Sequence, residues 1–201
     1  KLAEEIGHVP QAGDPRWKTI IERPGVIKVT EGGLFGHKET LDWHCNKPSN
    51  PERSPIIWIY AVKGSKGSIT SWIDNHKSYN DLPDDVKEKC KKIKFTCGFK
   101  KGGYTDDPFF REHHNTKLEQ NLVYTNEAGV TGLFFPYLQI LGGVPQDLYE
   151  YLKNHILQDK YRYDHYWEDG DVVISEQWLT IHKRHAFEKM NERLMYRIAI
   201  D

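Results

Sequence analysis

The chain has 201 residues, in which 28 Lys and Arg balance 29 Asp and Glu. This length predicts one domain over residues 1–201 with one sizeable core. The even charge argues against a nucleic-acid-binding or membrane-surface protein, so we expect a small molecule as the ligand.

Short apolar runs separated by Gly and Pro predict mostly β structure. The predicted strands are rich in Val, Ile, Thr and aromatic residues, and they cover residues 25–30, 56–64, 68–74, 121–125, 132–137, 171–177 and 193–200. Two predicted helices, 82–93 and 145–157, each have a proline near the first turn and apolar residues at helical spacing. Many short strands with few helices predict a mainly β fold with flanking helices, such as a jelly roll.

Residues 97–120 are polar, contain glycine and show no period. They predict a long loop, and loops of this length in compact domains often act as lids or binding loops. We therefore expect residues 97–120 to be a candidate lid.

The location of the protein is predicted from what the chain lacks. Its most apolar stretch, residues 131–143, is well short of the ~20 residues that a membrane-spanning helix needs. The first residues, KLAEEIGHVPQAGDPRWK, contain no apolar signal region. Cys45, Cys90 and Cys97 show no paired metal-ligand spacing, which favours reduced thiols inside a cell. We expect a cytoplasmic protein; assembly into a homo-oligomer stays open.

Two of the ten histidines lie in predicted extended segments beside other ligand-type residues: His44 in TLDWHCN and His182 in WLTIHKR. If residues 42–46 are extended, the side chains of Asp42, His44 and Asn46 point to one face. A jelly roll folds the chain back on itself, so His182 can lie beside His44 and Asn46 although it is far from them in the sequence. Two histidines and one carboxylate on one face of an ion form the site of non-haem Fe(II) oxygenases. We therefore predict iron bound by His44, His182 and Asn46.

Such an enzyme must also hold the distal carboxylate of 2-oxoglutarate, and the planar fork of arginine matches a carboxylate bidentately. Arg193 and Arg197 follow His182 and are four residues apart, so they share one face of the last predicted strand. Taken alone, Arg193 could instead form an exposed ion pair with Glu188 or Glu192, which would contribute little.

Several stretches resemble the taurine dioxygenase-like (TauD/TfdA) family of Fe(II)- and 2-oxoglutarate-dependent oxygenases, from RPGVIKVT to the C-terminus. DWHCN stands where the family has His-x-Asp, and KGSITSWIDNHKSYNDLP is similar to its threonine-containing segment. LVYTNEAGVTGLFF resembles its central hairpin, and HYWEDGDVVISEQWLTIHKR resembles its Trp-x-x-Gly-Asp strand with the distal histidine. The usual N-terminal portion of the family is largely missing.

The resemblance implies a double-stranded β-helix, a cupin-like jelly roll, with His44 and His182 as iron ligands. It implies that Arg193 binds the distal carboxylate of 2-oxoglutarate, that Thr70 helps to hold this co-substrate, and that Arg197 contacts an anionic group of the substrate. The implied enzyme uses dioxygen to hydroxylate a small organic acid or amino-acid-like molecule, releasing succinate and CO2. Ascorbate is a candidate reductant.

Asn46 departs from the family pattern, which has Asp or Glu there. An amide oxygen supplies a dipole where a carboxylate supplies a full charge, so metal affinity should fall. Three interpretations stay open: Asn46 binds iron more weakly, a chloride ion takes its place as in related halogenases, or the site is inactive and the protein is a jelly-roll binding protein. Asp42 is a further candidate ligand if the register differs.

Overall fold

The computed structural model of this protein describes residues 2–11, 19–20, 23–30, 39–50, 53–99, 117–187 and 193–201. The helical elements are α1 (Leu2–Ile6), α2 (Asn75–Asn80), α3 (Asp84–Lys91), η2 (Tyr137–Gln139), α5 (Gln146–Ile156) and η3 (Asp159–Tyr161). The strands are β1 (Thr19–Ile20), β2 (Arg23–Val29), β3 (Leu41–His44), β4 (Ile56–Lys63), β5 (Ile69–Asp74), β6 (Lys94–Cys97), β7 (Leu118–Asn121), β8 (Val123–Thr125), β9 (Thr131–Leu133), β10 (Ile140–Gly142), β11 (Arg162–Tyr166), β12 (Val172–Glu176), β13 (Thr180–Arg184) and β14 (Leu194–Ile200).

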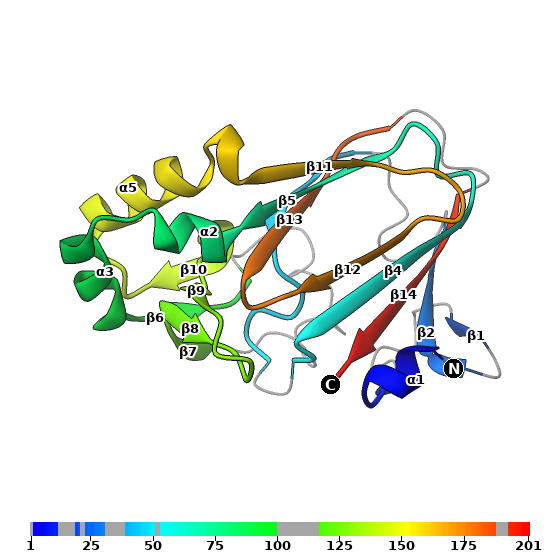
Figure 1. The fold of residues 1–201 in the computed structure, drawn as a ribbon, viewed down its shortest axis with the longest axis horizontal. Helices are drawn as coiled ribbons and strands as arrows, with labels where there is room; N and C mark the ends of the chain where they lie inside the picture. The colour runs from blue at the N-terminus through cyan, green and yellow to red at the C-terminus, as the bar shows by residue number, and fades with distance from the viewer. Residues whose placement is uncertain are drawn as a thin grey trace.

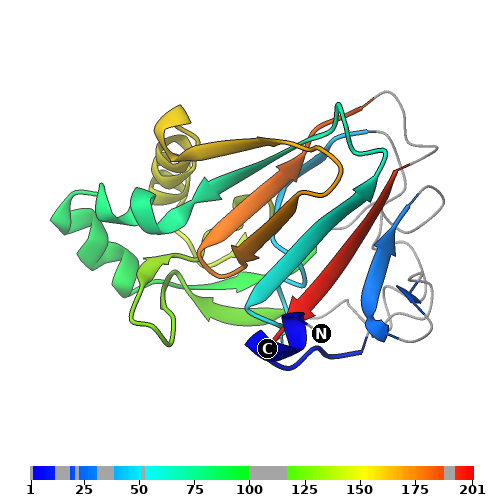
Figure 2. The ribbon, with the colours of Figure 1, turned by 45° about the vertical axis from the view of Figure 1, so that its right-hand side comes forward.

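Two antiparallel sheets form the jelly roll (Figures 1 and 2). One has the order β1-β2-β14-β4-β12, and the other has the order β11-β5-β13-β3. Between them, Ala61 and Met195 of the first sheet pack against Trp72 of the second and against Trp167. The last strand, β14, lies between β2 and β4, so the end of the chain pairs with its beginning. The predicted fold class is confirmed.

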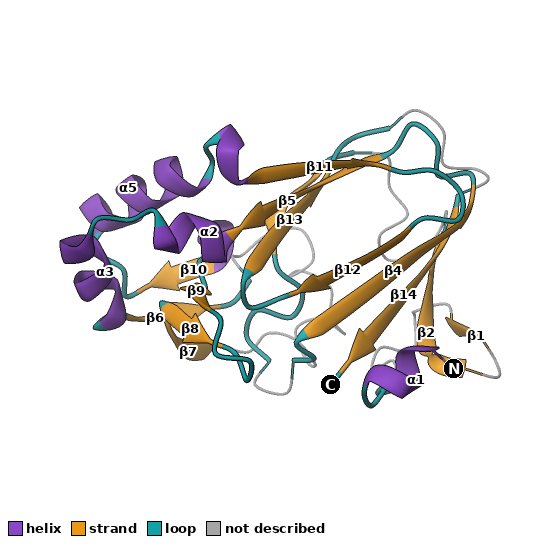
Figure 3. Ribbon diagram, in the orientation of Figure 1, coloured by secondary structure: helices purple, strands orange, loops and turns teal. Residues whose placement is uncertain are grey.

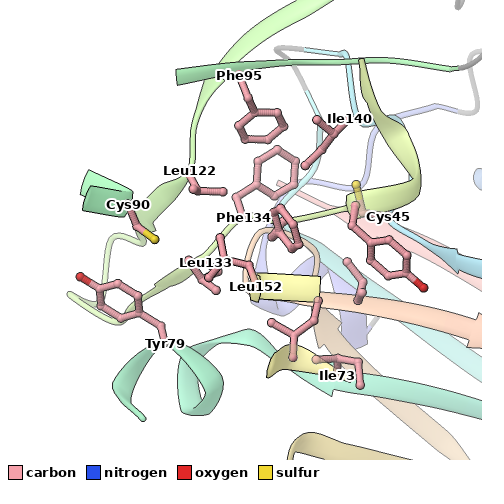
Figure 4. Packing of buried hydrophobic residues seen from close by; sticks show 14 of the residues in the cluster. Cys45, Ile73, Tyr79, Cys90, Phe95, Leu122, Leu133, Phe134, Ile140 and Leu152 are labelled. Carbon is pink, nitrogen blue, oxygen red and sulfur yellow. The ribbon is translucent and has the colours of Figure 1, made fainter. Parts of the chain in front are cut away.

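The largest core lies on the outer face of the four-stranded sheet, where α2, α3 and α5 gather (Figure 3). Side chains alternate along a strand, so Ile73 of β5 and Ile181 of β13 point to this face. Leu152 and Ile156 of α5 are fully buried against them in the same cluster, together with Tyr79 of α2 (Figure 4). This packing anchors the sheet that carries both histidines.

Helix α1 covers part of the outer face of the five-stranded sheet, beside the C-terminal strand in both views (Figures 1 and 2). Ala3 packs with Trp58 of β4 and Ile200 of β14. The backbone N–H of Asp201 donates to the carbonyl of His8 at 2.9 Å, which joins the two ends of the described chain. None of the described helices has both the length and the apolar character that crossing a bilayer requires.

The strong periodic segments were predicted close to their observed bounds. The strands predicted at 25–30, 56–64, 68–74, 171–177 and 193–200 are β2, β4, β5, β12 and β14, and the two predicted helices are α3 and α5.

Two predicted strands were partly wrong. The strand predicted at 132–137 ends at Leu133, because after Pro136 the chain enters the turn η2. The strand predicted at 121–125 is interrupted at Leu122, whose backbone N–H donates to the carbonyl of Ile93.

The predicted loop at residues 97–120 falls largely outside the described residues, which omit 100–116. Its last residues were predicted wrongly, because β7 begins at Leu118 and pairs antiparallel with β6. Strand β7 is at the edge of its sheet and alternates half-buried with exposed residues. Polar residues are common on such edge strands, so the apolar signal of a strand is missing there.

Candidate active site

Strand pairing brings the two predicted histidines together inside the jelly roll. His44 on β3 is the cross-strand partner of His182 on β13. Their ring centroids are 4.2 Å apart with the planes tilted by 51°. On its other side His182 pairs with Trp72 of β5, and their rings stack at 6.3 Å. Two imidazoles separated by 138 residues of chain (182 minus 44) therefore share one site.

Both imidazoles are in the form that binds a metal. The Nδ1 of His44 lies 2.6 Å from the carbonyl oxygen of Asp42, which can only accept, so Nδ1 carries the proton and Nε2 keeps its lone pair. Burial lowers the pKa of His44 to about 4, and the positive charges of Arg197 and Arg184 act in the same direction. Burial, followed by His44 and Arg197, lowers the pKa of His182 well below its usual value. Both rings are neutral at pH 7.

Asn46 lies just beyond the end of β3 and lines the same cavity as the two histidines, which has a volume of about 80 Å³. Its backbone N–H donates to Oε1 of Gln177 at 3.2 Å, and Nε2 of Gln177 donates to the carbonyl of Ser54 at 2.7 Å. The buried Gln177 thus fixes the backbone at position 46. Because this residue is an amide, the described residues contain no group of three His, Cys, Asp or Glu side chains that could hold a metal ion.

Asp42 does not take part, so the prediction that it shares a face with His44 was wrong. In the pairing with β13, His182 lies opposite His44 but Arg184 lies opposite Leu41, so β3 contains a bulge. The bulge breaks the regular alternation of side chains on which the prediction depended. Asp42 instead forms an exposed ion pair with Lys183 at 3.3 Å and is absent from the residues lining the cavity.

Arg193 lines the cavity from the opposite sheet and is 5% exposed. Its guanidinium packs over Phe187 at 5.0 Å, but Nε and Nη1 are buried and have no hydrogen-bond partner among the described residues. Burial lowers the pKa of Arg193 to about 10, so the side chain is still charged at pH 7. Glu188 and Glu192, its alternative partners in the sequence interpretation, are outside the described residues. A buried, charged donor without a partner is suited to an anionic ligand.

Thr70 on β5 is buried and also lines this cavity. Its Oγ1 accepts a hydrogen bond from Nε1 of the buried Trp167 at 2.9 Å. Since the indole N–H can only donate, the threonine keeps its own proton for another acceptor. The hydroxyl can therefore donate to an acceptor on a ligand in the cavity.

Arg197 lines the cavity as well, so all six predicted site residues converge there: His44, Asn46, Thr70, His182, Arg193 and Arg197. Burial lowers the pKa of Arg197 to about 10. The convergence joins side chains from β3, β5, β13 and the C-terminal strand region in one pocket.

A family model described as "Taurine catabolism dioxygenase TauD, TfdA family" matches residues 1–199. The chain belongs to this family. As a TauD/TfdA family member, the protein is an Fe(II)- and 2-oxoglutarate-dependent dioxygenase.

The relatives of the chain are distant in sequence. Pentalenolactone F synthase from Streptomyces avermitilis is 23% identical over 230 residues, which cover 98% of this chain and 74% of that protein. The fold is similar to a taurine dioxygenase from Burkholderia xenovorans, with a TM-score of 0.78, 18% identity, and coverage of 98% of this chain and 69% of that one. It is also similar to AAD-2 in complex with Mn(II) and N-oxalylglycine, with a TM-score of 0.67, 18% identity, and coverage of 79% of this chain and 62% of that one.

The residues present fit the cofactors of the TauD/TfdA family, with one weak point. Two neutral imidazoles suit Fe(II), and the Arg193 guanidinium, whose Nε and Nη1 have no hydrogen-bond partner among the described residues, suits a carboxylate of 2-oxoglutarate. The weak point is Asn46, which offers an amide oxygen in place of a charged one.

Two further residues of the pocket were missed from the sequence. Arg184 lines the cavity, and its Nη2 donates to the carbonyl of Glu39 at 2.8 Å. It lies two residues after His182 on the same strand, so side-chain alternation could have identified it. Trp167 is buried in the core and lines the cavity too. Its contact with Thr70 depends on pairing between distant strands, and no local signal predicts it.

Proposed function

We propose that this dioxygenase hydroxylates a small organic acid or amino-acid-like molecule, releasing succinate and CO2. In this proposal His44, His182 and Asn46 hold Fe(II), while Arg193 and Thr70 hold 2-oxoglutarate. The observation that supports it is the convergence of these residues in one pocket, together with the buried Nε and Nη1 of Arg193, which make no hydrogen bond within the described part of the chain.

Each side chain has a defined task in this proposal. Fe(II) and 2-oxoglutarate, when bound, supply the oxidation of a C–H bond by dioxygen. His44 and His182 present neutral nitrogens, because burial keeps them deprotonated. Arg193 neutralises the distal carboxylate of the co-substrate, and the Thr70 hydroxyl donates to it, held in place by Trp167.

Apolar side chains complete the walls of the pocket. Val29, Leu41, Ile59 and Met195 line it from both sheets. Such walls exclude water and strengthen the charged interactions inside the pocket. Arg197, the remaining cation of the predicted site, supports an anionic substrate.

The three cysteines support a location in the cytoplasm. All three are free and buried, as suits a reducing compartment.

The proposal is tested by measuring succinate formation from 2-oxoglutarate with Fe(II), ascorbate and dioxygen. We expect succinate from the wild type and at least a hundredfold less from His182→Ala, with His165→Ala as the matched control, because His165 pairs with Asp171 and does not line the pocket. Tight binding of Mn(II) and N-oxalylglycine without any succinate would identify a binding protein instead. A chlorinated product that depends on chloride would identify a halogenase.

A further inference from the structure

A second cavity lies next to the iron pocket and is lined by cations. Its volume is about 30 Å³, and Lys47, Arg53 and Arg197 line it. Arg197 also lines the iron pocket, and Lys47 directly follows Asn46, so the two cavities share a wall. Among the described residues, no Asp or Glu lines the second cavity. Its charge favours an anion.

Arg53 is the residue of this cavity whose position is most tightly fixed. The side chain is 4% exposed, and its guanidinium packs against two neighbouring aromatic rings, 3.7 Å from the centroid of Trp178 and 4.6 Å from that of Phe134. Its Nη1 donates to Sγ of Cys45 at 3.1 Å. The aromatic contacts stabilise the charge of the guanidinium and leave its N–H groups available for hydrogen bonds. The group is held rigid before any ligand arrives.

One edge of this guanidinium has no partner. Nε and Nη2 of Arg53 are buried and make no hydrogen bond among the described residues. These two nitrogens belong to the same edge of the planar group, which is the fork that binds a carboxylate with two parallel bonds. Glu176 is the nearby acid, and its charge interacts with that of Arg53, but the two side chains are not within ion-pair distance, and Oε2 of Glu176 accepts from Asn126 at 3.0 Å.

A buried charge with two unused donors is costly unless a ligand supplies the acceptor.

The volume of this cavity matches the ligand group that the fork selects. A water molecule needs roughly 10–15 Å³ of such space, so the cavity accommodates about two water-sized atoms. The two oxygens of one carboxylate fit this size.

We propose that Arg53 is a specificity-determining residue that binds a carboxylate of the primary substrate in the second cavity, while the rest of the substrate lies in the iron pocket. This inference rests on the proposed function and names its substrate class as carboxylic acids. The inference concerns Arg53 and not the two other cations of the cavity, since Lys47 and Arg197 have other contacts.

The test uses protein loaded with Mn(II) and N-oxalylglycine, so that the co-substrate position is filled before the probe is added. Straight-chain carboxylic acids of four to eight carbons and the matched primary amides are titrated by calorimetry. We expect at least one acid to bind at least tenfold more tightly than its amide, because the amide has no negative charge and keeps only one of the two acceptor oxygens. Arg53→Met should lower the affinity for that acid at least tenfold, and Arg53→Lys should retain part of it.

The control variant Arg162→Met removes a partly exposed arginine on β11 and should bind the acid as the wild type does. Equal binding of acids and amides, no binding of any acid, or unchanged acid binding in Arg53→Met would each overturn the inference. If Arg53→Met does not fold, Arg53→Lys decides the question: it keeps the positive charge but loses the planar fork, so acid binding as tight as in the wild type would overturn the inference. Failure of the wild type to bind Mn(II) and N-oxalylglycine would instead overturn the proposed function.

Discussion

Replacing Asn46 with Asp tests whether residue 46 contacts the metal. The cavity already contains two neutral imidazoles and three guanidinium groups, from Arg184, Arg193 and Arg197. A metal dication therefore enters a pocket that carries three positive charges and, among the described lining residues, no carboxylate. The new carboxylate adds an anionic ligand and reduces this repulsion. The nearby arginines favour its ionised form.

The size of the effect has a lower limit. Changing a group that only orients a metal ligand typically alters metal affinity by 10–100-fold. If residue 46 contacts the metal directly, changing its amide to a carboxylate should alter metal affinity by at least as much. A 10–100-fold change in affinity corresponds to about 1.4–2.8 kcal/mol. We therefore expect Asn46→Asp to bind Fe(II) at least tenfold more tightly than the wild type and to form succinate faster at low iron concentration.

The assay is an anaerobic competition titration of Fe(II) against a fluorescent chelator, repeated with Mn(II). Asn154→Asp is the control, since it adds the same charge at an exposed position of α5. Equal metal affinity in Asn46→Asp and the wild type would show that residue 46 does not bind the ion, and the ligand set argued above would be wrong.

Three other substitutions separate the tasks of the pocket from those of the core. Arg193→Met should raise the KM for 2-oxoglutarate at least tenfold, because it removes the charged partner of the distal carboxylate, while the affinity for Mn(II) does not fall. Trp167→Phe removes the 2.9 Å hydrogen bond to Thr70 and should weaken N-oxalylglycine binding about two- to tenfold, as measured by calorimetry. Leu152→Ala, in the fully buried core on α5, should lower the free energy of unfolding by about 2–5 kcal/mol in urea titrations without changing metal affinity.

For each of these substitutions, a contrary result would contradict the roles assigned to the residues. A normal KM in Arg193→Met would mean that another cation holds the co-substrate. Unchanged N-oxalylglycine binding in Trp167→Phe would show that the orientation of the Thr70 hydroxyl has no effect. A loss of metal binding in folded Leu152→Ala would mean that the helical core and the metal site are coupled.

The sequence by itself determined the elements with strong local patterns and the chemical identity of the site. Short runs rich in Val, Ile, Thr and aromatic residues predict β4 and β5, and helical spacing predicts α3 and α5, because each pattern depends on near neighbours. The positions of Arg193 and Arg197 four residues apart placed them on one strand face, and the structure brings both into the pocket with His44 and His182.

The tertiary structure decided what depends on contacts between distant segments. The bulge in β3 removed Asp42 from the site, and it arises in the pairing of β3 with β13, far along the chain. The Trp167–Thr70 hydrogen bond and the aromatic rings around Arg53 also join segments about a hundred residues apart. Such contacts leave no periodic signal in the sequence, since periodicity reports only which face of its own strand or helix a residue occupies.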